Sequence, residues 1–148
     1  MKSYLSILLL FLIMSCSVDD SSNVNQTEAD IKKYIEEHNL NAQRSDSGLY
    51  YVIEEQGNGD KPTSTSTVTV NYKGYFLNGS TFDQSGSDGI TFGLNQVIAG
   101  WTEGITYFNE GGEGMLLIPS HLGYGSQTYN GIPGGSVLLF DIKLLNVN

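Results

Sequence analysis

The stretch TVTVNYKGYFLNGSTFD, residues 67–83, alternates apolar and polar side chains and then reaches a turn signal. Val68, Val70 and Tyr72 fall on one side of an extended chain, because successive side chains of a strand point to opposite faces. The dipeptide Asn-Gly follows at 78–79, and it is the strongest short signal for a β-hairpin. The stretch therefore predicts two antiparallel strands with one buried face.

The sequence on either side continues this pattern of strands and turns. A short helix is predicted over 97–108, where Trp101 and Ile105 lie one helical turn apart. The Gly-rich segment 120–135 is too long for a hairpin turn and is a candidate functional loop. Further strands are expected over 48–55, 90–94, 114–119 and 136–147. The order predicts an α+β domain in which an antiparallel β-sheet wraps around one short α-helix.

A second short helix is predicted before the strands, over residues 28–39. Thr27 and Asp30 resemble a capping box at its start. Its apolar side chains recur at helical spacing and form one stripe, made by Ile31, Tyr34 and Ile35. Three helical turns offer little area for a partner, so the stripe is expected to pack on its own domain and the protein to be a monomer.

The composition excludes several classes of protein. The 148 residues carry a formal net charge of −9, whereas nucleic-acid binding rests on Lys and Arg that neutralise phosphates. A single Cys excludes an internal disulfide, and no cluster of Cys and His suggests a metal site. The motifs GxSxG, HExxH and GxxxxGKS/T are absent from the sequence. A β-rich globular domain without ordinary hydrolytic or nucleotide chemistry is what remains.

The N-terminus has the pattern of a bacterial export signal. A basic start is followed by the apolar run LSILLLFLIM, residues 5–14, and then by Ser15 and Cys16. As a helix the run would span about 15 Å, too little for a stable membrane span. Residues 13–16, Ile-Met-Ser-Cys, resemble a lipobox, so acylation of Cys16 is favoured over plain secretion. The polar residues that follow, to about residue 26, are expected to form a flexible tether.

Trp101 is the only Trp of the chain, and it follows Gly100 at the predicted start of the short helix. It could supply bulk to a core, or it could form the floor of a pocket. Further aromatic residues gather at the ends of the predicted elements, more than a small core around one helix needs. They are Tyr72, Tyr75, Phe82, Phe92, Tyr124, Tyr129 and Phe140.

Four segments resemble the signature segments of the FKBP-type peptidyl-prolyl cis-trans isomerases, in the same order and at similar spacing. They are VTVNYKGYFLNGSTFDQS, LNQVIAGWTEGI, LLIPSHLGYG and LLFDIKLLNV. The resemblance runs from about residue 48 to residue 148. It implies a five- to six-stranded antiparallel sheet around a short helix, with a proline-binding pocket between them. It also implies a reaction that needs neither a metal nor another cofactor.

The resemblance assigns catalytic roles to Asp83, Trp101 and Tyr124. The indole of Trp101 is implied to be the pocket floor, and the Tyr124 hydroxyl to bond a substrate carbonyl. Asp83 is implied to be a buried carboxylate beside the twisted amide, and the Ile98 N–H to bond a second carbonyl. The substrate-binding residues that it implies are Tyr72, Phe82, Ile90, Val97, Ile98, Ile132 and Phe140.

Three positions depart from the family pattern. Ile90 stands where many members have an aromatic residue, and Gln96 replaces a frequent acidic residue. No Arg follows Asp83 in the loop 85–89, so the usual ion-pair partner of that carboxylate is missing. Tyrosine hydroxyls or backbone donors are expected to hold Asp83 instead. The departures bear on substrate preference and on the binding of macrolide inhibitors, which the resemblance also implies as ligands.

The expected function is a peptidyl-prolyl isomerase that assists the folding of exported proteins in the bacterial envelope. Its partners would be proline-containing polypeptides and, through the lipid, a membrane, expected to be the outer one. The alternative is a chaperone module that holds proline-containing segments without catalysis. The expected organisation is a signal peptide (1–15), a lipidated tether (16–26), an N-terminal helix with a linker (27–46) and the isomerase domain (47–148).

Overall fold

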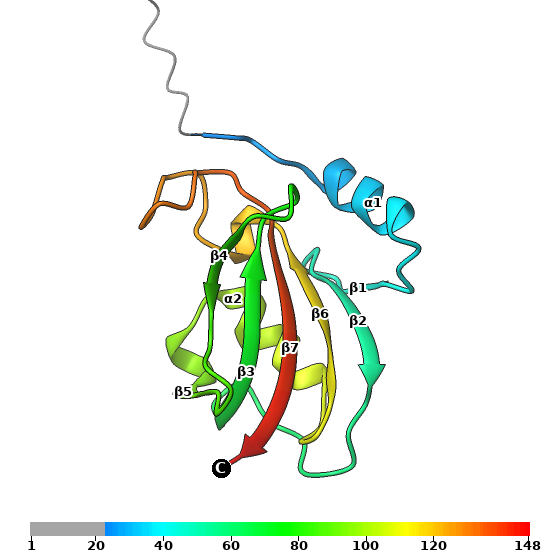
Figure 1. Ribbon diagram of the computed structural model, residues 1–148, viewed down its shortest axis with the longest axis vertical. Coiled ribbons are helices and arrows are strands. Elements are labelled where there is room, and N and C mark those ends of the chain that lie inside the picture. Colours follow the sequence, from blue (N-terminus) through cyan, green and yellow to red (C-terminus); the bar gives the residue numbers. More distant parts are fainter. Residues whose placement is uncertain (1–22) are drawn as a thin grey trace, which may run out of the picture.

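The computed structural model describes residues 23–148, which form an antiparallel sheet with one helix on each face (Figure 1). The strand order is β1-β2-β6-β7-β3-β4, and β5 pairs with the beginning of β3. The strands are β1 (Gln43–Arg44), β2 (Tyr50–Glu55), β3 (Thr67–Tyr75), β4 (Thr81–Gln84), β5 (Ile90–Gly93), β6 (Glu113–Ile118) and β7 (Leu138–Val147). The α+β architecture expected from the sequence is thereby confirmed.

The sheet has seven strands, whereas the resemblance implied five or six. The strands β4 and β5 share one edge of β3, where they pair with its two ends in turn. The two-residue strand β1 extends the opposite edge by pairing with Tyr50 and Tyr51. A strand of two residues is too short to show alternation, which is why β1 was not predicted.

The predicted hairpin is present between β3 and β4. Val68 and Val70 of β3 are fully buried, as the alternation of the stretch requires. The turn places Gly79 at a φ of +88°, a left-handed conformation that glycine adopts without steric cost. The Phe76 N–H then donates to the Ser80 carbonyl at 3.0 Å and closes the turn.

The helix α2 (Ala99–Gly104) packs against the inner face of the sheet. It is shorter than the predicted helix 97–108, because the chain tightens into a 3₁₀ turn at Ile105–Tyr107. A second 3₁₀ turn, Leu94–Gln96, comes just before it. Trp101 and Ile105 are both buried in the core that α2 shares with the sheet, as their spacing predicted.

Two glycines one turn apart set the distance between α2 and the sheet. A Cβ atom on Gly100 would lie 2.6 Å from Cγ2 of Ile118, and one on Gly104 would lie 2.7 Å from Leu116. Real Cβ atoms do not come so close to other heavy atoms, so only glycine allows this contact. The glycines on either side of Trp101 therefore let the helix lie directly on β6.

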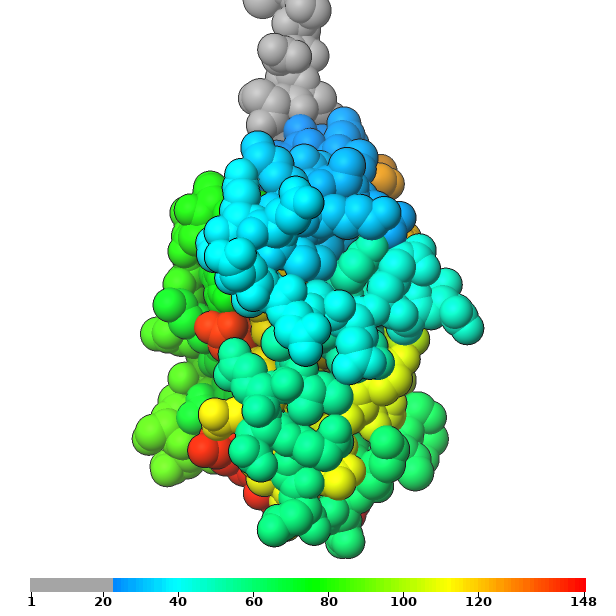
Figure 2. Space-filling model, turned by 90° about the vertical axis from the view of Figure 1, so that its right-hand side faces the viewer, coloured from blue at the N-terminus to red at the C-terminus, as the bar shows by residue number. Residues whose placement is uncertain are grey.

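The helix α1 (Glu28–Glu37) covers part of the outer face of the sheet (Figures 1 and 2). Its stripe packs there on a separate core, in which Ile31 is fully buried. The capping box forms as predicted, since the Thr27 N–H donates to Oδ2 of Asp30 at 2.7 Å. The prediction that the stripe packs on its own domain is confirmed.

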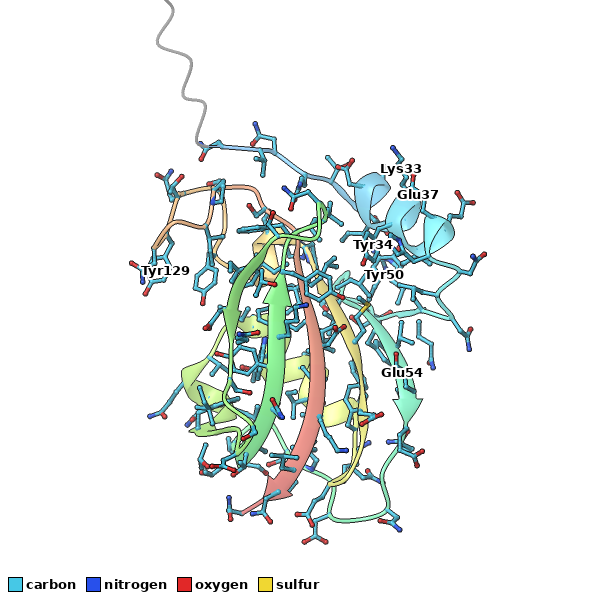
Figure 3. All side chains as sticks on the ribbon, in the orientation of Figure 1. Lys33, Tyr34, Glu37, Tyr50, Glu54 and Tyr129 are labelled. Carbon is cyan, nitrogen blue, oxygen red and sulfur yellow. The ribbon has the colours of Figure 1, made fainter. Side chains whose placement is uncertain are left out.

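The first turn of α1 is also joined to the neighbouring strands. Oε1 of Glu28 accepts hydrogen bonds from the Tyr50 hydroxyl at 2.7 Å and from Nε of Arg44 at 2.8 Å. These bonds, with that of Tyr50 first, lower the pKa of Glu28 from 4.5 to about 2. In Figure 3, Tyr34 and Tyr50 lie together where α1 meets β2.

The signal peptide and Cys16 fall outside the described residues. Of the expected tether, residues 23–26 are described, and they are hydrogen-bonded to the loop between β6 and β7, with the Val24 N–H 2.9 Å from the Gly134 carbonyl oxygen. Among residues 23–148, no helix is long and apolar enough to cross a membrane.

Candidate active site

A cavity of about 450 Å³ opens on the inner side of the sheet, between β3, β4, β5, β7, the start of α2 and the loop that follows β6. Nine of the ten residues that the resemblance assigned to the site line it. The complete lining is Tyr72, Phe82, Asp83, Ile90, Phe92, Gln96, Val97, Ile98, Trp101, Tyr124, Tyr129 and Phe140. Seven of these twelve side chains, including that of Trp101, are aromatic, so the surface of the cavity consists mainly of aromatic rings.

Trp101 is the most enclosed aromatic side chain of the cavity after Phe140, with 5% of its surface exposed. Three rings meet it edge to face: Tyr72 at 5.1 Å, Phe140 at 5.1 Å and Phe92 at 5.3 Å between centroids. Aromatic rings prefer such tilted contacts because the positive ring edge meets the negative ring face. The indole is held from several sides and forms the floor of the cavity.

The wall beside Trp101 depends on a glycine in β3. A Cβ atom on Gly74 would lie 2.7 Å from Phe140 and 2.8 Å from Phe82. Without that atom, the two Phe rings lie over the strand and meet edge to face at 5.5 Å. A small residue in β3 thus leaves room for large side chains from β4 and β7, and these side chains form the wall of the cavity.

The carboxylate of Asp83 is held by the donors expected in the absence of an Arg. The Tyr72 hydroxyl donates to its Oδ2 at 2.6 Å, and the Gln84 N–H donates to its Oδ1 at 2.9 Å. The resemblance implied a buried carboxylate, and here the structure differs because Asp83 is exposed. It lies on the short strand β4, which forms an edge of the sheet and has a neighbouring strand on one side only.

The opposite rim of the cavity is a pair of tyrosines on the long loop between β6 and β7. The rings of Tyr124 and Tyr129 stack at 4.8 Å with an angle of 12° between their planes. They are 38% and 52% exposed, and Ile90 of β5, which also lines the cavity, is 44% exposed. Figure 3 shows Tyr129 at the outer edge of this loop. The rim is thus exposed to solvent, whereas the floor is buried.

Two tyrosine hydroxyls of the site are held in their protonated form. Burial, and then the hydrogen bond to Asp83, raise the pKa of Tyr72. Burial, and then the neighbouring Tyr129 and Asp83, raise the pKa of Tyr124. Both groups can therefore act as hydrogen-bond donors throughout the physiological pH range.

One residue of the lining, Ile98, has a backbone donor without a partner in the described part of the chain. Ile98 comes just before α2, and its carbonyl accepts the N–H groups of Trp101 and Thr102. Within residues 23–148, no acceptor is found for the Ile98 N–H. A bound ligand with a carbonyl group could take this donor.

The lining matches an uncharged ligand. Of the twelve residues, Asp83 is the single member of the acidic and basic residue types, and no Lys, Arg or His is among them. Over residues 23–148, no three His, Cys, Asp or Glu side chains are grouped to hold a metal ion. His38 and His121 each contact a backbone carbonyl, and neither lines the cavity.

The structure differs from the expected set of residues in a few places. Ile132 is buried in the core and does not line the cavity, because its backbone pairs with Tyr129 and turns it inward. Phe92, Gln96 and Tyr129 line the cavity but had no assigned role. Phe92 and Tyr129 were visible as aromatic residues at the ends of elements. Only the pairing of β5 with β3 and the stacking on Tyr124 show that they belong to the site.

An antiparallel sheet around a short helix, with an aromatic cavity at the start of that helix, defines the FKBP class of peptidyl-prolyl isomerase folds. The model of the family "FKBP-type peptidyl-prolyl cis-trans isomerase" matches residues 59–145, and the chain belongs to this family. The resemblance that the four segments carry is thereby confirmed.

Relatives and solved structures agree with this assignment. The isomerase FkpA of Buchnera aphidicola subsp. Schizaphis graminum is 41% identical over 131 residues, 86% of this chain and 51% of the relative. A crystal structure of FkpA from Escherichia coli has a TM-score of 0.75 and 41% identity, covering 82% of this chain and 59% of the other. A peptidyl-prolyl isomerase from Pseudomonas syringae has a TM-score of 0.71 and 29% identity, covering 85% and 98%. The chain thus spans about half the length of the FkpA relative of Buchnera.

Proposed function

We propose that the protein is a peptidyl-prolyl cis-trans isomerase of the bacterial envelope that acts on proline-containing segments of exported proteins. The observation that carries the proposal is the floor of the cavity, where Trp101 is enclosed by three aromatic rings. A flat apolar floor of this size suits the ring of a proline. Membership of the family and the likeness to FkpA support the same activity.

The proposed mechanism uses binding alone to lower the barrier of rotation. The X-Pro amide resists rotation because resonance must be broken, at a cost of about 18–20 kcal/mol. The twisted amide has lost that resonance and is less polar than the planar one, so an apolar cavity favours it. Interactions that are stronger with the twisted state than with the planar one raise the rate.

The polar groups of the site would hold the peptide in that twisted state. The Tyr124 hydroxyl and the Ile98 N–H would donate to the carbonyl groups that flank the proline. Loss of resonance leaves the carbonyl carbon of the twisted amide more positive, which the negative charge of Asp83 would favour. Tyr72 would keep this carboxylate in place through its hydrogen bond of 2.6 Å.

A protease-coupled assay with proline-containing peptides tests the proposal. The full-length chain in detergent should accelerate isomerisation above the uncatalysed rate, and Trp101→Leu should abolish the acceleration. Several residues before the proline must be tried, because Ile90 and Gln96 alter the lining. Absence of acceleration with all of these peptides would refute the proposed activity.

A module that binds proline-containing segments without catalysis is the second candidate. The exposure of Asp83 and the absence of an ion pair for it within the described chain favour this alternative. Tyr124→Phe removes one hydrogen bond, worth about 0.5–1.5 kcal/mol, and should reduce kcat/KM by about 2- to 12-fold if catalysis matters. If this variant and Asp83→Val refold client proteins as well as the wild type while losing isomerase activity, the holding role is favoured.

We also propose that Cys16 carries a lipid that anchors the chain in the envelope, as the lipobox-like residues 13–16 suggest. Acyl chains contribute roughly 0.8 kcal/mol per buried CH₂ group, so several chains give a durable anchor. Metabolic labelling with a fatty acid should mark the wild type and not Cys16→Ala, which should leave the membrane fraction. Label that persists in Cys16→Ala would refute the anchor site.

A further inference from the structure

The segment before α1 runs along the long loop between β6 and β7 and is hydrogen-bonded to it. Figure 1 shows the chain ahead of α1 running beside this loop at one end of the sheet. The Val24 N–H donates to the Gly134 carbonyl, and the Gln26 N–H donates to the Gly135 carbonyl, both at 2.9 Å. We call residues 23–26 the strap, and residues 119–137 the rim loop.

Side chains of the strap add to these backbone bonds. Oε1 of Gln26 accepts the Val137 N–H at 2.8 Å, and Val137 is fully buried. At the other end of the strap, Oδ1 of Asn23 accepts the Thr128 hydroxyl at 3.3 Å. The strap therefore reaches both the middle of the rim loop and its return to β7.

One glycine links the strap to the tyrosine pair. The carbonyl of Gly135 accepts the Gln26 N–H, and the N–H of Gly135 donates to the Gly125 carbonyl at 2.8 Å. Gly125 directly follows Tyr124 in the chain. A Cβ atom on Gly135 would lie 2.7 Å from the backbone nitrogen of Asn25, so the strap and the loop are in close backbone contact. Two hydrogen bonds thus separate Gln26 from the residue beside Tyr124.

Away from the strap, the rim loop is held by Ile132, which is buried in the main core, and by His121, whose Nε2 lies 2.8 Å from the Ser47 carbonyl oxygen. Its tyrosines are exposed, and the bridge between Tyr129 and Ile132 is internal to the loop. A loop of this length loses much conformational entropy when it is ordered, so contacts made from outside it decide how well it is held. The strap supplies such contacts along one side of the loop.

We propose that the strap positions the rim of the cavity, with Gln26 as the positioning residue that keeps Tyr124 and Tyr129 over the floor. The effect on ligand binding rests on the proposed function, whereas the effect on the loop does not. Gln26 touches no ligand in this account and acts through Gly135 and Val137. The last residues of the expected tether thereby position the binding site without touching its ligand.

The test compares Gln26→Ala with Gln26→Glu in the full-length chain in detergent. Alanine removes the acceptor of the Val137 N–H, and glutamate keeps an oxygen in its place. Gln43→Ala, which truncates an exposed glutamine of β1, is the matched control. Amide hydrogen exchange over residues 123–137 and the Kd of a proline-containing peptide, followed by Trp101 fluorescence, are measured for each variant.

Gln26→Ala should raise amide exchange in the rim loop by about tenfold and weaken peptide binding by about 2- to 12-fold, the range expected for one lost hydrogen bond. Gln26→Glu should restore both towards the wild type, and Gln43→Ala should change neither. Exchange in β3 and β7 should stay as in the wild type, which separates local loosening from general unfolding.

Unchanged loop exchange in Gln26→Ala would overturn the proposal. So would looser exchange that leaves the peptide Kd unchanged, because the strap would then support the loop without positioning the rim. If the wild type binds no proline peptide at all, the proposed function fails, and the exchange data still decide whether the strap holds the loop.

Discussion

The floor and the rim of the cavity use the same kind of side chain in opposite surroundings. Trp101 and Phe140 of the floor are buried and belong to the main core. Tyr124 and Tyr129 of the rim are exposed and contact each other on a loop. The floor is therefore maintained by the packing that maintains the fold, while the rim is maintained by local contacts and the strap.

This difference separates two kinds of mutational effect. A change in the floor should reduce stability and binding together, because the same contacts serve both. A change in the rim should reduce binding and leave the free energy of unfolding nearly unchanged. Measurements of both quantities for the same variants decide whether the distinction holds.

Trp101→Ala should have the largest effect. Removing a buried aromatic side chain costs about 3–5 kcal/mol, through lost contacts and the cavity left behind. The three rings around the indole lose their common partner. Denaturant unfolding should show this loss, and peptide binding should disappear. A variant that binds no peptide but unfolds like the wild type would place Trp101 outside the core and break the comparison.

Gly100→Ala should come next, because its new methyl group would meet Ile118 at 2.6 Å. Overpacking of this kind costs about 1–3 kcal/mol, which exceeds the roughly 1 kcal/mol that alanine gains over glycine in a helix. Thermal unfolding should therefore begin at a lower temperature. Gly86→Ala is the control, since nothing lies within 4 Å of its added atom. Equal stability of the two variants would mean that α2 can move away from β6.

Tyr129→Ala tests the rim. The variant removes one aromatic side chain of the cavity lining, and its contact with a bound peptide should be worth about 0.5–1.5 kcal/mol, so peptide affinity should fall by about 2- to 12-fold. The free energy of unfolding should change by less than about 0.5 kcal/mol, as for most exposed positions. Isothermal titration and denaturant unfolding give the two values. A loss of stability as large as that of Gly100→Ala would contradict the separation of rim from floor.

Glu28→Gln should have the smallest effect, and one that depends on pH. The folded-state pKa of about 2 lies below the ordinary 4.5, so ionised Glu28 stabilises the fold above pH 4.5, and this contribution is lost as the pH falls towards about 2. The variant should be slightly less stable than the wild type at neutral pH, and the difference should vanish below about pH 2. A constant difference across this range, in urea unfolding, would show that the charge of Glu28 is not responsible.

Much of the floor could be predicted from the sequence, because it follows from periodicity and from short motifs. The alternation of Val68, Val70 and Tyr72 predicts the central strand, and the Asn-Gly pair predicts its hairpin. Trp101 and Ile105, one turn apart, predict the buried side of α2. The four family-like segments add the roles of Tyr72, Phe82 and Phe140, which no pattern of spacing could supply.

The rim and its support could not be predicted in the same way. The segment 120–135 was identified as a candidate functional loop, but nothing in its sequence shows that Tyr129 stacks on Tyr124 or that Ile132 turns inward. From the sequence, the strap was interpreted as part of a polar tether. Its contacts are hydrogen bonds to a loop more than a hundred residues later in the chain, and the sequence gives no sign of them. Such contacts leave no periodic signal in the sequence.

The most direct test of the account is a titration of the full-length chain with a proline-containing peptide, followed by the fluorescence of Trp101. Trp101 is the only indole of the chain, so the signal reports on the floor alone. The account predicts a saturable change in emission, which a matched peptide with Ala in place of Pro does not produce. Isomerase activity in a chain whose Trp101 emission stays constant at saturating peptide would contradict the assignment of Trp101 as the proline-binding floor.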